Sequence, residues 1–228
     1  MDFEEAVDKA PPGWRHFSVE DIDRLPFAIR AHELARVPRG ETEERILRGL
    51  FWTLVYHLEP GRWDALARHE PIAAGLLEAL PRHVHTAIDV GAGSGRLTEH
   101  LVTRTRRTIA VEPSAGLRAL LTRRLPRVRT LAGWAERLPL RDRSSQLTAA
   151  CGAFGPDTEI LAELERVTVP GGTIALISPE QPDWFEERGW RRVSVPTQTP
   201  PPHPAWLDDF FGSLDPPHEM VMRRLEAG

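Results

Sequence analysis

Thr86–Gly95 reads Thr-Ala-Ile-Asp-Val-Gly-Ala-Gly-Ser-Gly, and the fold can be worked out from this stretch. The apolar run Ala87–Val90 predicts a buried strand that ends at Gly91. Glycines at alternate positions allow a tight turn and a close approach of the backbone to a ligand, because they carry no Cβ. We expect a helix over about Gly95–Thr103 with Ser94 as its cap. The free N–H groups at its amino end favour a carboxylate or a phosphate.

The spacing of the glycines distinguishes between two kinds of ligand. A dinucleotide fingerprint, G-x-G-x-x-G, needs its third glycine at the position of Arg96. The chain instead has an acid, Asp89, two residues before the first of three alternate glycines. In this pattern it resembles the class I S-adenosylmethionine-dependent methyltransferases, whose first motif is D-x-G-x-G-x-G. The resemblance implies S-adenosylmethionine as the cofactor. The residues of this motif that it places at the cofactor are Asp89, Gly91, Ala92, Gly93 and Gly95.

A second acid stands about 20 residues further on, at the spacing expected for a ribose-binding group. Thr108–Val111 predicts the next strand, and Glu112 follows it directly. One carboxylate can accept short, charge-assisted hydrogen bonds from two ribose hydroxyls. Pro113 and Ser114 then predict the start of a helix. We predict that Glu112 and Pro113 belong to the cofactor site, while a solvated loop acid is the alternative interpretation of Glu112.

Gly133–Leu140, Gly-Trp-Ala-Glu-Arg-Leu-Pro-Leu, is the most specific stretch of the chain. It is similar to the G-D-A-E-x-L-P sequence of related methyltransferases, in which the Asp and the next backbone amide bind adenine. Trp134 replaces that Asp, which removes the acceptor for the exocyclic amine. An indole at this position could stack on the purine or simply cap the core. The resemblance therefore places Trp134, Ala135 and Glu136 beside the adenine.

Ser145–Cys151 predicts a further strand, and the resemblance places the transferred methyl group at its carboxyl end. Cys151 is accordingly predicted to contact the cofactor as a small buried thiol, with a nucleophile as the alternative, and Gly152 and Phe154 are predicted to contact the substrate. No Asn/Asp-Pro-Pro-Tyr/Phe motif follows, which disfavours methylation of nucleic-acid bases. The family often carries Tyr where this chain has His69, so His69 is a further substrate-side candidate, or else an ordinary surface histidine. We assign no catalytic residue, because no His/Asp pair stands out as a base, and we predict no metal site, because the nine histidines show no metal-binding spacing.

The alternation of strands and helices predicts an α/β fold, a doubly wound and mostly parallel sheet with helices on both faces. The resemblance implies a Rossmann-like sheet of seven strands with the last one antiparallel. It covers about residues 62–228, which divides the chain into an N-terminal helical cap, 1–60, and a methyltransferase domain, 61–228. Within the cap, Thr42–Leu58 carries an apolar stripe at helical spacing behind a Thr42 N-cap. We expect the cap to cover the carboxyl edge of the sheet and to shape the acceptor pocket.

Length and composition fit this interpretation. The chain has 228 residues, a hydrophobic content of 41% and a net charge of −4, which argues against a general nucleic-acid or anionic-membrane binder. Its single cysteine suits a reducing compartment, and the acidic Met1–Ala10 lacks the apolar segment of a signal peptide. We predict a cytoplasmic enzyme that transfers a methyl group from S-adenosylmethionine to a small-molecule acceptor, by in-line attack on the sulfonium methyl. No nucleic acid or membrane is an expected partner, and a homodimer is a possible assembly.

Two alternatives stay open at this point. A non-catalytic S-adenosylmethionine-binding subunit is suggested by Trp134, by Gln146 and by the lack of a recognisable base. A nucleic-acid methyltransferase is suggested by a group of arginines. These are Arg104, Arg106, Arg107, Arg123, Arg124, Arg127 and Arg129. They fall at the expected helix-to-strand connections, at the amino edge of the sheet and away from the predicted cleft.

Overall fold

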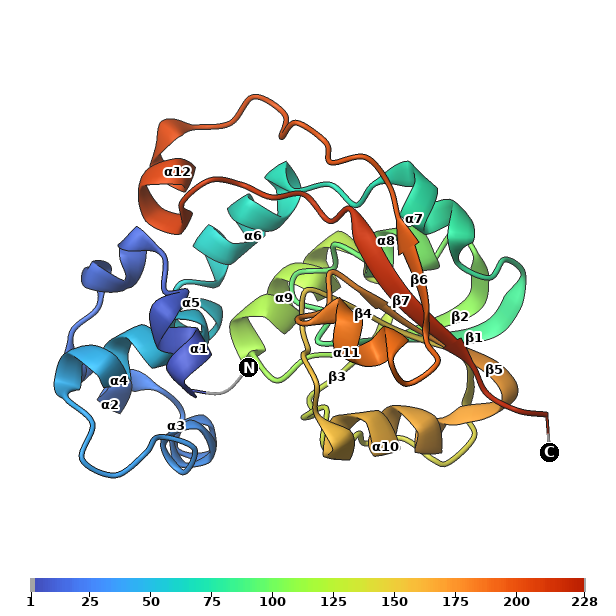
Figure 1. The fold of residues 1–228 in the computed structure, drawn as a ribbon, viewed down its shortest axis with the longest axis horizontal. Helices are drawn as coiled ribbons and strands as arrows, with labels where there is room; N and C mark the ends of the chain where they lie inside the picture. Colours follow the sequence, from blue (N-terminus) through green and yellow to red (C-terminus); the bar gives the residue numbers. More distant parts are fainter. Residues whose placement is uncertain (1–2, 228) are drawn as a thin grey trace.

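The computed structural model describes residues 3–227, so the first two residues of the expected cap and the last residue of the chain lie outside it. Within the described residues, seven strands form one sheet in the order β3-β2-β1-β4-β5-β7-β6 (Figure 1). The strands are β1 Val84–Val90, β2 Thr105–Val111, β3 Arg129–Leu131, β4 Ser145–Cys151, β5 Thr168–Ile177, β6 Arg191–Ser194 and β7 Glu219–Arg224. Strands β1 to β5 pair in parallel, and β7 runs antiparallel to β5 and β6. This topology confirms the predicted Rossmann-like sheet.

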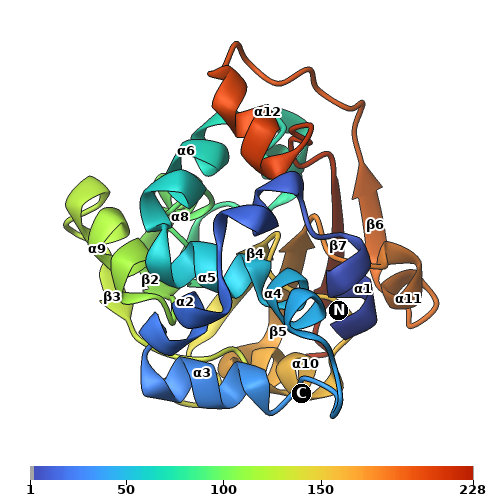
Figure 2. The ribbon, with the colours of Figure 1, turned by 90° about the vertical axis from the view of Figure 1, so that its left-hand side faces the viewer.

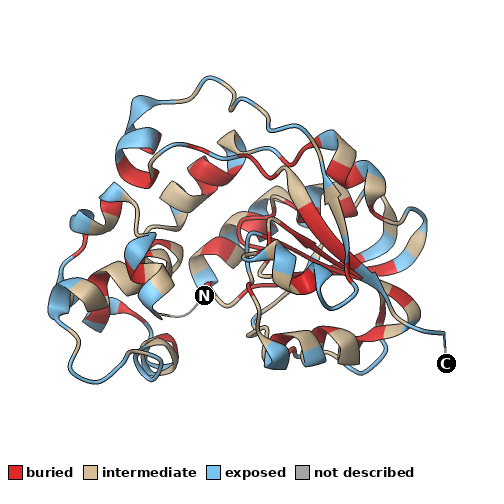
Figure 3. Ribbon diagram, viewed as in Figure 1, coloured by how far each residue is buried: buried red, intermediate tan, exposed pale blue. Residues whose placement is uncertain are grey.

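The described residues also form helices. They are α1 Phe3–Asp8, η1 Pro12–His16, α2 Val19–Arg24, α3 Phe27–Leu34, α4 Glu43–Gly49, α5 Phe51–Leu58, α6 Pro60–His69, α7 Ala74–Ala79, α8 Thr98–Leu101, α9 Ala115–Arg124, α10 Thr158–Val167, α11 Pro182–Glu186 and α12 Ala205–Phe211. One apolar layer lies between the sheet and α7 and α8, and a second lies between the opposite face and α10 and α11. The central strands are consequently buried on both sides, as Figure 3 shows. None of the helices within residues 3–227 has the length and apolar character needed to cross a bilayer.

A third apolar core lies outside the sheet layers and joins the N-terminal helices to a helix near the C-terminal end of the chain. It contains Phe17, Ile22, Leu25, Leu47, Leu50, Phe51, Leu54, Val55, Leu66, Leu207, Phe210, Phe211 and Leu214. Helix α12 comes from the connection between β6 and β7, yet it packs beside the N-terminal helices (Figures 1 and 2). The ring of Phe51 lies 5.7 Å from that of Phe210. The N-terminal helices are therefore stabilised by a segment that follows them by more than 140 residues.

The Thr42–Leu58 stripe forms two helices where the sequence predicts one. Leu50 separates α4 from α5 with φ −93° and ψ 2°, so the helical axis changes direction between them. The hydroxyl of Thr42 accepts a hydrogen bond from the Arg45 amide at 3.3 Å, which confirms the predicted N-cap. The break directs the side chains of α5 toward both the third core and the carboxyl edge of the sheet.

The predicted cap at Ser94 is wrong. Helix α8 begins only after Leu97, and no side chain caps it. Gly95 has φ +103°, so the turn continues past Ser94 before the backbone becomes helical. The expected helix over Gly95–Thr103 is thereby reduced to four residues, and its amino end lies further from the turn than the sequence indicates.

Candidate active site

The glycine turn after β1 is packed so tightly that it leaves no room for side chains. Gly91 and Gly93 have φ +67° and +56°, a region that L residues rarely adopt. A Cβ at Gly91 would lie 2.9 Å from the Cβ of Ala153, and one at Gly93 would lie 2.9 Å from Nε1 of Trp63. Glycine is favoured at these two positions by the backbone conformation and the local packing, and both line the cavity, where the turn backbone can approach a ligand closely.

Glu112 connects the end of β2 to this turn. Its Oε2 accepts a hydrogen bond from the Gly93 amide at 2.9 Å, and its Oε1 accepts one from the Ser114 amide at 2.7 Å. The residue is 5% exposed, and burial raises the pKa of its carboxyl above the ordinary range. Each oxygen of a carboxylate has two lone pairs, so Glu112 can still accept hydrogen bonds from ligand hydroxyls.

Asp89 lies under the turn with one oxygen unsatisfied. Its Oδ2 accepts a hydrogen bond from the Thr98 hydroxyl at 2.5 Å, whereas Oδ1 is buried and has no partner among the described residues. Burial raises the pKa of the Asp89 carboxyl to about 7. It borders a small pocket of about 10 Å³, room for about one water molecule, which Arg96 and Cys151 also line. A buried acceptor without a donor is suited to a ligand ammonium.

A cavity of about 240 Å³ opens at the carboxyl ends of the strands. Ten of the sequence-predicted site residues line it: Gly91, Gly93, Glu112, Pro113, Trp134, Ala135, Glu136, Cys151, Gly152 and Phe154. Asp89 and Ala92 line the adjoining small pocket instead. Two predicted residues line neither space. Gly95 packs against Leu121, and His69 Nδ1 lies 2.8 Å from the Ala65 carbonyl oxygen, on its own helix.

The opposite wall of the cavity comes from helices α3, α5 and α6 and from Arg36, which follows α3. Its residues are His32, Glu33, Arg36, Thr53, Tyr56, His57 and Trp63. Burial raises the pKa of the Tyr56 phenol, so it stays protonated. The Ser114 hydroxyl, which caps α9, also donates to the Tyr56 carbonyl at 2.6 Å and thereby fastens α5 to the sheet domain. Helical periodicity indicates only that α5 is amphipathic, which is why these residues could not be singled out from the sequence.

Trp134 and Glu136 meet helix α3 directly. The indole of Trp134 stacks on the imidazole of His32, with ring centroids 4.3 Å apart and planes inclined by 23°. The Glu136 carboxylate pairs with Arg36 at 2.7 Å. Helix α3 therefore closes the cavity over the segment that the sequence assigns to adenine.

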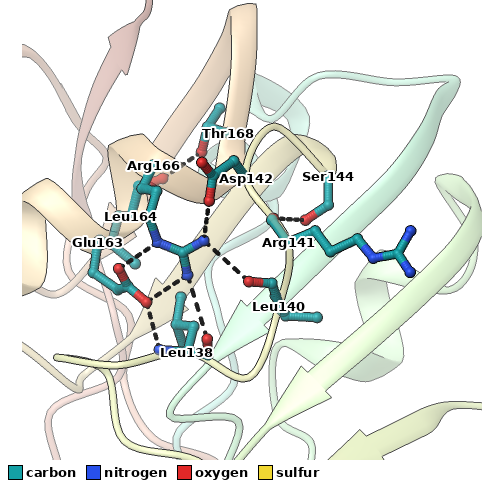
Figure 4. A network of polar contacts seen from close by, with 9 residues as sticks. All are labelled: Leu138, Leu140, Arg141, Asp142, Ser144, Glu163, Leu164, Arg166 and Thr168. Atoms are coloured by element: carbon teal, nitrogen blue, oxygen red, sulfur yellow. Dashed lines mark hydrogen bonds and ion pairs between the residues drawn. The ribbon is translucent and has the colours of Figure 1, made fainter.

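The loop that follows this segment is held by Arg166 of α10 (Figure 4). Its guanidinium donates to the carbonyl oxygens of Leu138 and Leu140 and to the carboxylates of Asp142 and Glu163. Glu163 in turn accepts a hydrogen bond from the Leu138 amide at 2.6 Å. These bonds hold the loop at Leu138, Leu140 and Asp142, directly after the segment that carries Trp134 and Glu136.

At the other end of the cavity, Arg96 and Cys151 lie side by side. Arg96 pairs with Glu70 at 3.2 Å, and Glu70 also accepts a hydrogen bond from the Asp215 amide at 3.0 Å. Burial raises the pKa of the Cys151 thiol, which opposes formation of a nucleophilic thiolate. Within residues 3–227, no group of three or more His, Cys, Asp or Glu side chains is arranged to hold a metal ion.

Comparison with known proteins agrees with this geometry. A family model described as "Methyltransferase domain" matches residues 87–172, a span that includes the glycine turn, Glu112, the Trp134 segment and Cys151. Residues 87–172, more than a third of the chain, are therefore similar to a methyltransferase domain.

Curated relatives carry the same family name without a defined activity. An uncharacterized methyltransferase of Mycobacterium tuberculosis is 34% identical over 115 residues, 48% of this chain and 47% of the relative. One of Schizosaccharomyces pombe is 35% identical over 95 residues, 40% of this chain and 38% of the relative. This chain thus spans about half the length of the curated relatives it matches. The solved structure of a SAM-dependent methyltransferase from Aquifex aeolicus is 17% identical with a TM-score of 0.50, covering 72% of this chain and 96% of that one, and shows the shared fold.

Proposed function

We propose that this chain binds S-adenosylmethionine and transfers its methyl group to a small-molecule acceptor. One observation carries the proposal: Asp89 and Glu112, two buried carboxylates, meet at a glycine turn that no side chain could occupy. The unpartnered Oδ1 of Asp89 would accept from the cofactor ammonium, and Glu112 would accept from the ribose hydroxyls. Trp134 and Ala135 would pack against the adenine. Carboxylates would thus face the ammonium and the ribose hydroxyls of the cofactor, and an aromatic and an apolar side chain would face its adenine.

S-adenosylmethionine, when bound, supplies a methyl group that is already activated by the sulfonium. The protein is then required mainly to orient the acceptor and to exclude water, and orientation can contribute about 7–11 kcal/mol to a bimolecular reaction. Tyr56, Trp63 and Phe154 line the cavity with aromatic surface and would limit the access of water to the sulfonium. The high pKa of Tyr56 opposes a role as a general base at neutral pH.

We propose a small acceptor and a lid function for residues 1–60. A cavity of about 240 Å³ offers space on the scale of a small molecule, and helices α3 and α5 close one side of it. Residues 61–228 would form the methyltransferase domain proper. The third core nevertheless joins α12 to the N-terminal helices, so the lid and the domain share apolar packing. The unpaired, buried Cys151 supports the expectation of a reducing compartment such as the cytoplasm.

The arginine group lies elsewhere in the fold. Arg106 and Arg107 stand near the amino end of β2, and Arg127 and Arg129 near the amino end of β3. Together with Arg124 they line a separate surface groove at the edge opposite the cavity. This position gives no support to a nucleic-acid methyltransferase, because a bound strand there would not reach Cys151 or Phe154.

Calorimetric titration with S-adenosylmethionine and, separately, with NAD tests the cofactor. We expect saturable binding of the first and none of the second, and the reverse result would refute the proposal. Transfer of a labelled methyl group to small metabolites then separates an enzyme from a non-catalytic cofactor-binding subunit.

A further inference from the structure

Three carboxylates line the cavity, and they differ in how far their oxygens are already occupied. Glu112 accepts hydrogen bonds from two backbone amides, and Oε1 of Glu136 pairs with Arg36. Glu33 has no arginine or lysine partner among the described residues. Its Oε1 lies 3.0 Å from His32 Nδ1, and its Oε2 accepts from the Thr53 hydroxyl at 3.2 Å. Each Glu33 oxygen therefore keeps acceptor capacity at the cavity wall.

Helix α3 holds Glu33 at the same end of the cavity as Trp134. The adjacent residue, His32, stacks on the Trp134 indole, and Arg36, one turn further on, pairs with Glu136. Thr53 of α5 fixes the Glu33 carboxylate from the other side. These contacts place a fixed carboxylate from the N-terminal segment at the wall where the proposed function seats the purine.

A 6-aminopurine presents two N–H donors on its exocyclic nitrogen. On the loop at this end the indole of Trp134 is a donor only, Ala135 has no polar group, and the carboxylate of Glu136 is engaged by Arg36. A buried amine without an acceptor would be costly. From this juxtaposition we infer that Glu33 accepts a hydrogen bond from the exocyclic amine of the cofactor's adenine. Residues 1–60 thereby determine cofactor specificity as well as covering the site, an inference that rests on the proposed function.

The inference predicts discrimination between adenine and hypoxanthine. A 6-oxo group presents an acceptor to the Glu33 carboxylate, so two acceptors would face each other and binding would weaken. The Gln side chain has the same shape and carries an N–H₂ donor, so Glu33→Gln should accommodate the 6-oxo group.

The experiment compares S-adenosylhomocysteine with S-inosylhomocysteine by calorimetric titration of the full chain. We expect the wild-type protein to prefer the adenosyl compound by about tenfold or more, the size of a hydrogen bond to a charged group. In Glu33→Gln the affinity for the adenosyl compound should fall by about tenfold, while that for the inosyl compound is kept or improves. Retained binding of the inosyl compound also shows that the variant is folded.

Glu44→Gln is the matched control, because it makes the same change at an exposed glutamate of α4, outside the cavity. Its preference for the adenosyl compound should equal that of the wild type. An unchanged preference in Glu33→Gln, or a lost preference in Glu44→Gln, overturns the assignment of Glu33. Failure of the wild type to bind S-adenosylhomocysteine overturns the proposed cofactor, and the role of Glu33 with it.

Discussion

Asp89 should make the stability of the ligand-free protein depend on pH. Its carboxyl is 1% exposed, and burial raises its pKa from 3.8 to about 7. The unfolded chain therefore loses this proton near pH 4, whereas the folded chain keeps it until about pH 7. Between these values the folded state binds more protons than the unfolded state, so the free energy of unfolding falls as the pH rises. Ionising Asp89 in the folded protein costs about 4 kcal/mol in full, at 1.36 kcal/mol per pH unit.

Urea denaturation of the wild type and of Asp89→Asn from pH 5 to pH 8 measures this effect. The amide is isosteric, can still accept from Thr98 and does not ionise. Over this range the free energy of unfolding of the wild type should fall by about 2.5 kcal/mol relative to that of Asp89→Asn. This is less than the full cost because part of the change occurs below pH 5. Asp209→Asn, at an exposed position on α12, is the control. Its free energy of unfolding should change with pH as that of the wild type does. Parallel curves for Asp89→Asn and the wild type would refute the reasoning.

Three further predictions concern the residues that hold the site together. Glu112→Ala should lower the free energy of unfolding by about 2–5 kcal/mol in urea, because two buried amides lose their acceptor, and should also weaken S-adenosylmethionine by about 1.5–3 kcal/mol in a titration. Gly93→Ala should abolish binding of S-adenosylmethionine, since its Cβ would meet Trp63, whereas Gly40→Ala, also at positive φ but in open space, should bind normally. Arg166→Met should cost about 1–2 kcal/mol of stability and increase proteolysis of the loop that it holds; a fully resistant loop would contradict its anchoring role.

The mostly parallel sheet and the residues at its carboxyl edge could be predicted because the determining signals are local. Ile88 and Val90 are apolar and lie in a short run bounded by Gly91, and Glu112 follows the next such run at a fixed distance. Each of these features depends on residues within one strand and one turn. The positions at the carboxyl edge then follow from the parallel topology alone.

The second wall of the cavity could not be predicted in this way. Glu33 is held at the cavity by Thr53 of α5, and Tyr56 by the hydrogen bond from Ser114, the cap of α9, to its carbonyl. Helix α12 was also missed, since Leu207, Phe210 and Phe211 follow a proline-dense stretch that indicates an extended connection. In both cases the deciding contacts join residues far apart in the sequence, which periodicity within one segment does not show.

The shared packing of α12 and the N-terminal helices has a consequence for synthesis of the chain. Phe51 emerges from the ribosome roughly 160 residues before Phe210, its partner in the third core, and translation at about 5–20 residues per second separates the two by roughly 8–30 s. During that interval the apolar surface of α5 has no partner from α12. The newly made N-terminal helices are thus candidates for protection by a chaperone until α12 has been synthesised.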